Sequence, residues 1–164
     1  MSFNGIQMGP HTMLDEGIER TLDLIQDTAA TNAVMPSSHA YNNALVKALR
    51  DRADHGVPLT DNAGRKFPLV WVRTNDRYYT HTSLRHQVVD GSFEHHDRDL
   101  FREIVEPARR RGMKVYARVL ESAAMARVVK NYATVVTRDV HGPPTSVACW
   151  KYPEYVGFWG DTMQ

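Results

Sequence analysis

The polar side chains best placed to do chemistry follow the predicted strands of this chain. Amide, imidazole, hydroxyl, guanidinium and carboxylate groups occur there together, and this mixture suits hydroxyl recognition, because sugars offer paired hydrogen-bond donors and acceptors and an apolar ring face. In parallel barrels, ligands meet the carboxyl ends of the strands and the loops after them. The candidate substrate-binding residues are therefore Gln7, His11, Ser37, His39, Tyr41 and Arg118, with Trp150 in a Pro-rich loop as an aromatic platform.

Each candidate also has a structural alternative. Gln7 lies near a Gly-Pro pair and could satisfy loop backbone, and lone histidines are more often solvated or structural than catalytic. Arg118 could instead pair inside a barrel with a carboxylate from a neighbouring strand. Glu121 is the best single catalytic candidate by position. A carboxyl group in acid/base catalysis commonly acts with a second one, and no second one is identified.

The remaining reactive side chains favour structural roles. His95, His96 and Asp97 invite a metal hypothesis, but adjacent histidines on a strand point to opposite faces and no His-Glu-x-x-His or spaced Cys/His set accompanies them. A polar approach to a helix is the favoured interpretation, and no metal is expected. Cys149 adjoins Trp150 and is expected to pack as a small side chain rather than act as a nucleophile.

Several mechanisms find no support in the sequence. The chain contains no G-x-G-x-x-G, no G-x-x-x-x-G-K-[ST] and no G-x-S-x-G. Nucleotide hydrolysis, dinucleotide redox chemistry and the usual serine-esterase mechanism are therefore disfavoured, and no cofactor is expected.

Apolar periodicity predicts the elements that position these groups. A strand over 3–8 ends at a Gly-Pro pair, and a helix over roughly 14–30 follows from Leu14, Ile18, Leu22 and Ile25, which recur at helical spacing. A brief second strand over 33–35 is closed by a proline.

A second helix–strand passage follows a long insertion. Residues 97–111 have a helical pattern that Pro107 should kink, with Gly112 as its C-cap, and 114–120 is the clearest strand in the chain. A helix followed by a glycine and a buried strand is typical of a parallel α/β sheet. A further helix is predicted to start at Pro153.

The insertion covers residues 37–96. Within it, 41–52 has a helical pattern, whereas 56–66 is interrupted by Pro, Gly, Asp and Asn residues. Residues 67–73 are expected to add a short extended segment.

Length and composition indicate one soluble domain over 1–164. Lys and Arg total 20 against 19 Asp and Glu, a formal charge of +1 without a sustained block of one sign, so nucleic acid is not an expected partner. A single cysteine excludes an internal disulfide. No export signal or membrane-spanning stretch is visible, so we expect a cytoplasmic protein without a membrane partner.

Two passages carry a resemblance to a known family. These are FREIVEPARRRGMKVYARVLES and RDVHGPPTSVACWKYPEYVGFW, preceded by FNGIQMGPH, an amphipathic helix and AVMP. In this order they resemble the N-terminal part of TIM-barrel glycoside-hydrolase-like proteins. The resemblance implies an α/β fold that is a partial (β/α) barrel, with about three strand–helix units and a long insertion after strand two. A complete barrel takes eight strands and about 250 residues.

The resemblance implies a carbohydrate-active barrel segment. The chain would contribute one wall of a sugar-binding site and would not be a complete catalyst, because the acid/base and nucleophile carboxylates commonly lie on the fourth and seventh strands. Whether it is itself an enzyme, a glycoside-hydrolase-like one if completed by further strands, stays open.

Two alternatives stand beside that hypothesis. The first is a non-catalytic carbohydrate-binding or assembly module, which could form a homo-oligomer through an exposed sheet edge. The second is an unrelated small α/β enzyme, in which residues 67–73 would form a central strand of the same sheet.

Overall fold

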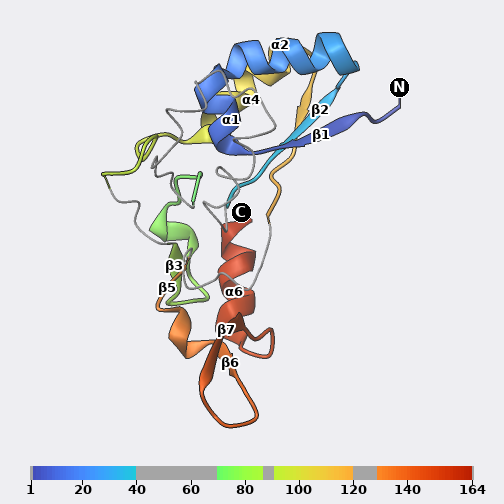
Figure 1. The fold of residues 1–164 in the computed structure, drawn as a ribbon. Helices are drawn as coiled ribbons and strands as arrows, with labels where there is room; N and C mark the ends of the chain where they lie inside the picture. Colours follow the sequence, from blue (N-terminus) through green and yellow to red (C-terminus); the bar gives the residue numbers. More distant parts are fainter. Residues whose placement is uncertain (1, 40–69, 87–90, 120–128, 164) are drawn as a thin grey trace. The chain divides into compact units, whose positions relative to one another are not determined.

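The computed structural model describes residues 2–39, 70–86, 91–119 and 129–163. The chain divides into two compact units, one of Met1–Val72 and Val89–Leu120 and the other of Arg73–Val88 and Glu121–Gln164. The described residues form four α-helices and three small sheets, one of them parallel (Figure 1). The predicted α/β class is confirmed at this level, and the described strands close no barrel.

A parallel sheet and three helices make up the described part of the first unit. The sheet has the order β1-β2-β4, and both of its pairings are parallel. The elements are β1 (Gly5–Met8), α1 (Pro10–Glu16), α2 (Ile18–Ala29), β2 (Ala33–Pro36), α4 (Leu100–Arg110) and β4 (Lys114–Val115).

One face of this sheet carries the hydrophobic core. Ile6, Val34 and Val115 lie side by side in register across the three strands. Val34 is fully buried, and Ile6 and Val115 pack against the buried cluster to which it belongs. The helices supply the rest of this cluster, including Met13, Leu14, Leu22, Ile25, Leu100, Ile104 and Ala108. Side chains alternate between the two faces along each strand, so the residues directly before and after each of these three face the other side of the sheet.

The predicted helix over 14–30 is two helices in the structure. Gly17 separates α1 from α2 with φ +88°, a conformation that favours glycine. Pro10 opens α1, where its missing N–H costs no helical hydrogen bond. The predicted apolar face is nevertheless buried, because Leu14 is 8% and Leu22 0% exposed on either side of the break.

The helix α4 matches its prediction closely. Asp99 caps its start by accepting a hydrogen bond from the Arg102 backbone (3.1 Å), and Pro107 lies within the helix. Gly112 follows the C-cap residue with φ +67°, as the predicted helix end requires. Two ion pairs tie this end to α2, from Arg111 to Asp23 (2.6 Å) and from Arg110 to Glu19 (2.5 Å).

The predicted third strand is shorter in the structure than in the sequence pattern. β4 covers only Lys114 and Val115, and pairing with β2 resumes at an isolated parallel bridge between Ser37 and Arg118. Of the predicted segment 67–73, residues 67–69 lie outside the described residues. Val70 forms an antiparallel bridge with His39, beyond the end of β2. The described part of this segment therefore adds no central strand to the parallel sheet.

The second unit is built differently. Its strands form two antiparallel pairs, β3 with β5 and β6 with β7, accompanied by the helix α6. The elements are η1 (Asp76–Tyr78), β3 (Arg85–His86), β5 (Val129–Lys130), η2 (Tyr132–Thr134), β6 (Val136–Arg138), β7 (Pro144–Ala148) and α6 (Pro153–Thr162). Its buried hydrophobic side chains are half aromatic and half aliphatic, and the aromatic ones are Tyr79, Tyr155, Phe158 and Trp159.

The connection between β6 and β7 contains the sequence D-x-x-G-x-P, residues 139–144. Asp139 Oδ1 accepts a hydrogen bond from the His141 backbone (2.8 Å), and Gly142 donates to the Asp139 carbonyl (3.1 Å) with φ +96°. An aspartate whose side chain accepts a hydrogen bond from the backbone two residues later, and a glycine with positive φ, are both typical of turns. This motif makes a hairpin turn.

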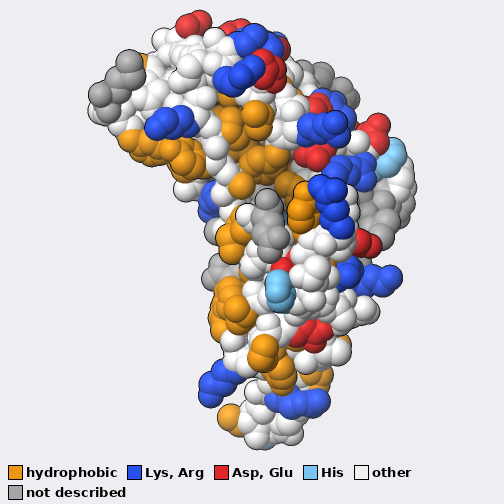
Figure 2. Space-filling view, turned by 180° about the vertical axis from the view of Figure 1, so that it is seen from behind, with side chains coloured by type: hydrophobic (Ala, Val, Ile, Leu, Met, Phe, Trp, Pro, Cys, Tyr) orange, Lys and Arg blue, Asp and Glu red, His pale blue; other side chains and the backbone are white. Residues whose placement is uncertain are grey.

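Charged side chains of both signs are mixed over the face of the molecule shown in Figure 2, with exposed hydrophobic patches between them. In the described part of the chain, no helix is long and apolar enough to cross a membrane.

Candidate functional site

The carboxyl edge of the parallel sheet brings two predicted site segments together. The Ser37 backbone donates to the Met8 carbonyl (3.3 Å), and the Arg118 backbone donates to the Pro36 carbonyl (2.9 Å). Side chains continue this pairing, because Arg118 Nη1 donates to Ser37 Oγ (3.2 Å). Residues about 80 positions apart in the sequence thus meet where parallel sheets commonly bind ligands.

The segment after β2 is polar and buried. Ser37 is 9%, Ser38 3% and His39 1% exposed. Ser38 Oγ lies 2.8 Å from His39 Nδ1, and the Ser38 backbone donates to the Arg118 carbonyl (3.0 Å). Buried polar groups are hydrogen-bonded in stable folds, so these contacts fix both side chains at the edge of the sheet.

The predicted residues after β1 have different surroundings. His11 lies in α1 and is 9% exposed, which places its imidazole inside the unit. Gln7 lies within β1 beside Met35 of β2 and is exposed. Gln7 belongs to the sheet face opposite Ile6 and the helices, one position before the end of the strand.

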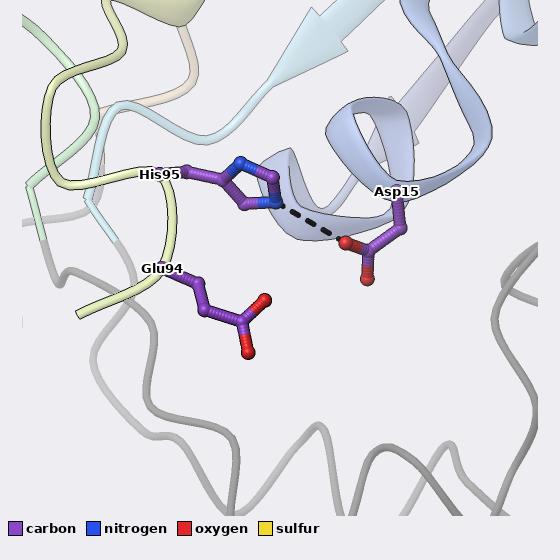
Figure 3. A group of neighbouring side chains, drawn as sticks. All are labelled: Asp15, Glu94 and His95. Carbon is purple, nitrogen blue, oxygen red and sulfur yellow. Dashed lines mark hydrogen bonds and ion pairs between the residues drawn. The ribbon is translucent and has the colours of Figure 1, made fainter.

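A group of side chains that the sequence did not indicate comes together near the end of α1. Asp15 of α1 lies beside Glu94 and His95 of the segment before α4, and one ligand atom from each residue falls within 4.8 Å of the other two (Figure 3). His95 Nε2 is 3.2 Å from Asp15 Oδ1, and the Asp15 side chain is only 3% exposed. An imidazole and two carboxylates form a set that can hold a divalent cation.

Trp71 connects this group to the carboxyl edge of the sheet. Its backbone donates to the Ser38 carbonyl (2.9 Å), and its ring lies 6.5 Å from the His95 imidazole at an interplanar angle of 44°. Trp71 is 1% exposed, so it is a core residue and not an exposed sugar platform. The Asp15, Glu94 and His95 group therefore rests on the same framework as Ser38 and His39.

The other predicted site residues are not brought to this edge by described contacts. Trp150 belongs to the second unit, where it is 53% exposed and its ring centroid lies 4.7 Å from that of Tyr155. Tyr41 and Glu121 lie outside the described residues. The predicted catalytic role of Glu121 accordingly stays a prediction.

Polar groups of the second unit mainly hold its segments together. The Asp161 side chain is 1% exposed and accepts a hydrogen bond from the His81 backbone (3.0 Å) while its other oxygen lies 2.7 Å from His81 Nδ1. These bonds lower the pKa of Asp161. Glu154 similarly accepts from the Ser83 backbone (3.1 Å). Both carboxylates attach the segment before β3 to α6.

The central histidine of the second unit is held uncharged. His86 is 8% exposed, and its ring centroid lies 4.9 Å from that of Phe158 and 5.8 Å from that of Tyr79. Burial among these rings lowers the pKa of His86 to about 4. A neutral imidazole surrounded by aromatic rings is a core residue of this unit.

Comparisons of the chain with known protein families, with curated proteins and with solved structures give no match in any of the three. The geometry of the described residues is therefore the basis for the functional proposals that follow.

Proposed function

We propose that this chain is a carbohydrate-active, glycoside-hydrolase-like barrel segment whose parallel sheet contributes one wall of a sugar-binding site. The observation that carries the proposal is the hydrogen-bonded carboxyl edge, where Arg118 Nη1 reaches Ser37 Oγ beside the buried Ser38 and His39. The order β1-β2-β4 with helices on one face is also the arrangement expected of successive strand–helix units.

The chemistry of this edge suits a neutral, hydroxyl-rich ligand. A guanidinium group carries five N–H donors in a fixed plane, and serine hydroxyls both donate and accept. Arg118 directs one donor to Ser37, which orients the guanidinium plane at the edge of the sheet. An oriented donor group next to hydroxyls recognises vicinal sugar hydroxyls without a charged ligand group. We propose a binding role, with catalysis depending on carboxylates supplied by further strands.

The test is saturation-transfer NMR with cellotriose, maltotriose and chitotriose as probes. The wild-type chain should transfer saturation to at least one trisaccharide, and Arg118→Ala should reduce the signal at least about tenfold, because it removes the guanidinium donors from the edge of the sheet. Lys114→Ala is the matched control, since Lys114 is an exposed cation at the start of β4 and away from the carboxyl edge that Arg118 reaches. Absence of transfer to every probe, or equal loss in both variants, would contradict the proposal.

A second function is favoured by the other face of the sheet. Phe3 is 63% and Tyr116 44% exposed, and their rings meet edge to face at 6.0 Å. Gly5 makes room for this arrangement, because a Cβ there would lie 2.7 Å from the Phe3 ring. An exposed aromatic pair on a sheet face is typical of an assembly surface. In an assembly module, sedimentation velocity would show concentration-dependent association that Tyr116→Ser weakens; a monomer at all concentrations would exclude it.

A further inference from the structure

We propose that Asp15, Glu94 and His95 form a binding site for a divalent transition-metal cation of the Zn²⁺ class. The inference does not depend on sugar binding, and its test contains no sugar. One ligand atom from each of the three side chains lies within 4.8 Å of the other two. The three residues come from two segments about 80 positions apart, so the fold itself creates the group.

The geometry is close to that of a coordinated ion. Metal–ligand bonds of about 2.0–2.2 Å place neighbouring ligand atoms about 3–3.5 Å apart. The distance from His95 Nε2 to Asp15 Oδ1 is 3.2 Å and already lies in this range. Figure 3 shows the Glu94 carboxylate next to the His95 ring and the Asp15 carboxylate. A side-chain rotation of Glu94 would complete the set.

The charges favour a doubly positive ion. Two carboxylates stand within reach of each other, and the Asp15 side chain is almost fully buried. A divalent cation bound between the two carboxylates would be attracted by both negative charges. The imidazole nitrogen then selects a transition metal such as Zn²⁺ over Mg²⁺ or Ca²⁺, which prefer all-oxygen sites.

The surrounding framework holds the imidazole in place. The ring of the buried Trp71 packs against the His95 ring, and His95 has φ +58°, which is uncommon for a residue other than glycine. Residues held in such conformations concentrate at functional sites. Three protein ligands would leave at least one coordination position for water or for a ligand oxygen.

The test is isothermal titration calorimetry of the full chain with ZnCl₂ after chelator treatment. The wild-type chain should bind one Zn²⁺ at this site, and Asp15→Asn and His95→Ala should each weaken binding at least about tenfold. Substitution of a residue that only orients a metal ligand already lowers metal affinity about tenfold or more, so the loss of a ligand should cost at least as much. His96→Ala is the matched control, because His96 is the adjacent, exposed histidine and should leave this binding unchanged.

Two further measurements keep the inference falsifiable. Glu94→Gln removes one charge from a partly buried residue, and it substitutes for Asp15→Asn if that variant does not fold. Imidazole ¹⁵N NMR should show Zn²⁺ shifting the His95 ring signals and not those of His96. No binding by the wild-type chain, or undiminished binding by the Asp15, Glu94 and His95 variants, would overturn the site, while the sugar experiment would keep its own outcome.

Discussion

The two units differ in the partners of their buried polar side chains. In the first unit, Ser38 and His39 at the carboxyl edge of the parallel sheet, and the Asp15 side chain beside His95, are nearly inaccessible to solvent. In the second unit, the buried Asp161 carboxylate binds the backbone and the imidazole of His81, which attaches the segment before β3 to α6. The difference separates the polar groups of the proposed sites from polar groups that join segments.

The hydrophobic cores of the two units also differ in the side chains that pack together. The first unit packs aliphatic side chains of three helices onto one face of its sheet. The second has short antiparallel pairs and relies on contacts between rings, with Phe158 touching Tyr79, His86 and Trp159. The following variants test this contrast in order of expected effect.

The largest effect is expected for Phe158→Ala. Phe158 is fully buried at the centre of the aromatic cluster, and truncation of such a ring costs about 3–5 kcal/mol of unfolding free energy. Hydrogen exchange should show the loss in amides of β3 and α6. The counterpart in the first unit is Leu22→Ala at a fully buried aliphatic position, with a cost of about 2–5 kcal/mol. A loss below about 1 kcal/mol for Phe158→Ala would refute the central role of this ring.

Acid should destabilise the second unit through His86. Because its pKa is about 4 in the folded chain and about 6.5 when unfolded, the unfolded state binds more protons between these values. Stability from the neutral ring is complete above pH 6.5 and is lost as the pH falls towards 4, by up to about 3 kcal/mol.

The measurement for His86 is urea unfolding at pH 7 and pH 4.5. His86→Leu should unfold with a smaller difference between the two pH values than the wild-type chain. His141→Asn, at an exposed turn position, is the control and should keep the wild-type difference. An unchanged pH difference in His86→Leu would show that this ring is protonated equally in both states.

A smaller effect is expected for Gly157→Ala. A Cβ at position 157 would lie 2.8 Å from the His81 carbonyl oxygen, so the α6 segment would have to shift, at a cost of about 1–3 kcal/mol. Gly160 in the same helix has no atom within 4 Å of such a Cβ. Gly160→Ala should therefore be neutral or stabilise the helix by up to about 1 kcal/mol. Equal thermal stabilities of the two variants would contradict the close approach.

The smallest effect concerns the start of α4. Asp99→Ala removes the side-chain acceptor of the Arg102 N–H and should cost about 0.5–2 kcal/mol. The exposed Asp97, which the sequence suggested near the helix start, should tolerate alanine within about 0.5 kcal/mol. The two variants are compared by chemical denaturation. A larger loss of unfolding free energy for Asp97→Ala than for Asp99→Ala would contradict the assignment of Asp99 as the N-cap.

The sequence predicted the elements whose buried faces have a strong period. The spacing of Leu14, Ile18, Leu22 and Ile25 correctly predicted the side that packs on the sheet. It did not predict the break at Gly17, because a glycine is tolerated inside a helical pattern and only its φ of +88° reveals the end of α1. The short β4 was overestimated, since apolar residues beyond Val115 extend the pattern without extending the continuous ladder.

The candidate site was only partly accessible from sequence. The predicted parallel α/β pattern agrees with the position of Arg118, which pairs with Ser37 just beyond the end of β2. The rule that ligands meet the carboxyl ends of such strands made both residues candidates, and their binding role stays a prediction. The group of Asp15, Glu94 and His95 was missed, because metal-ligand spacing along one segment was sought and the donors come from two remote segments. The sequence also offered no reason for the glycine at position 157, which the close approach of the His81 carbonyl explains.

The most direct test of the functional account is amide chemical-shift mapping of the ¹⁵N-labelled chain with the trisaccharide that gives the strongest saturation transfer. The account predicts shifts concentrated at Ser37, Ser38, His39 and Arg118, the residues that meet at the carboxyl edge of the sheet. Shifts confined to the second unit, or no shifts at saturating sugar, would contradict a sugar-binding wall at this edge.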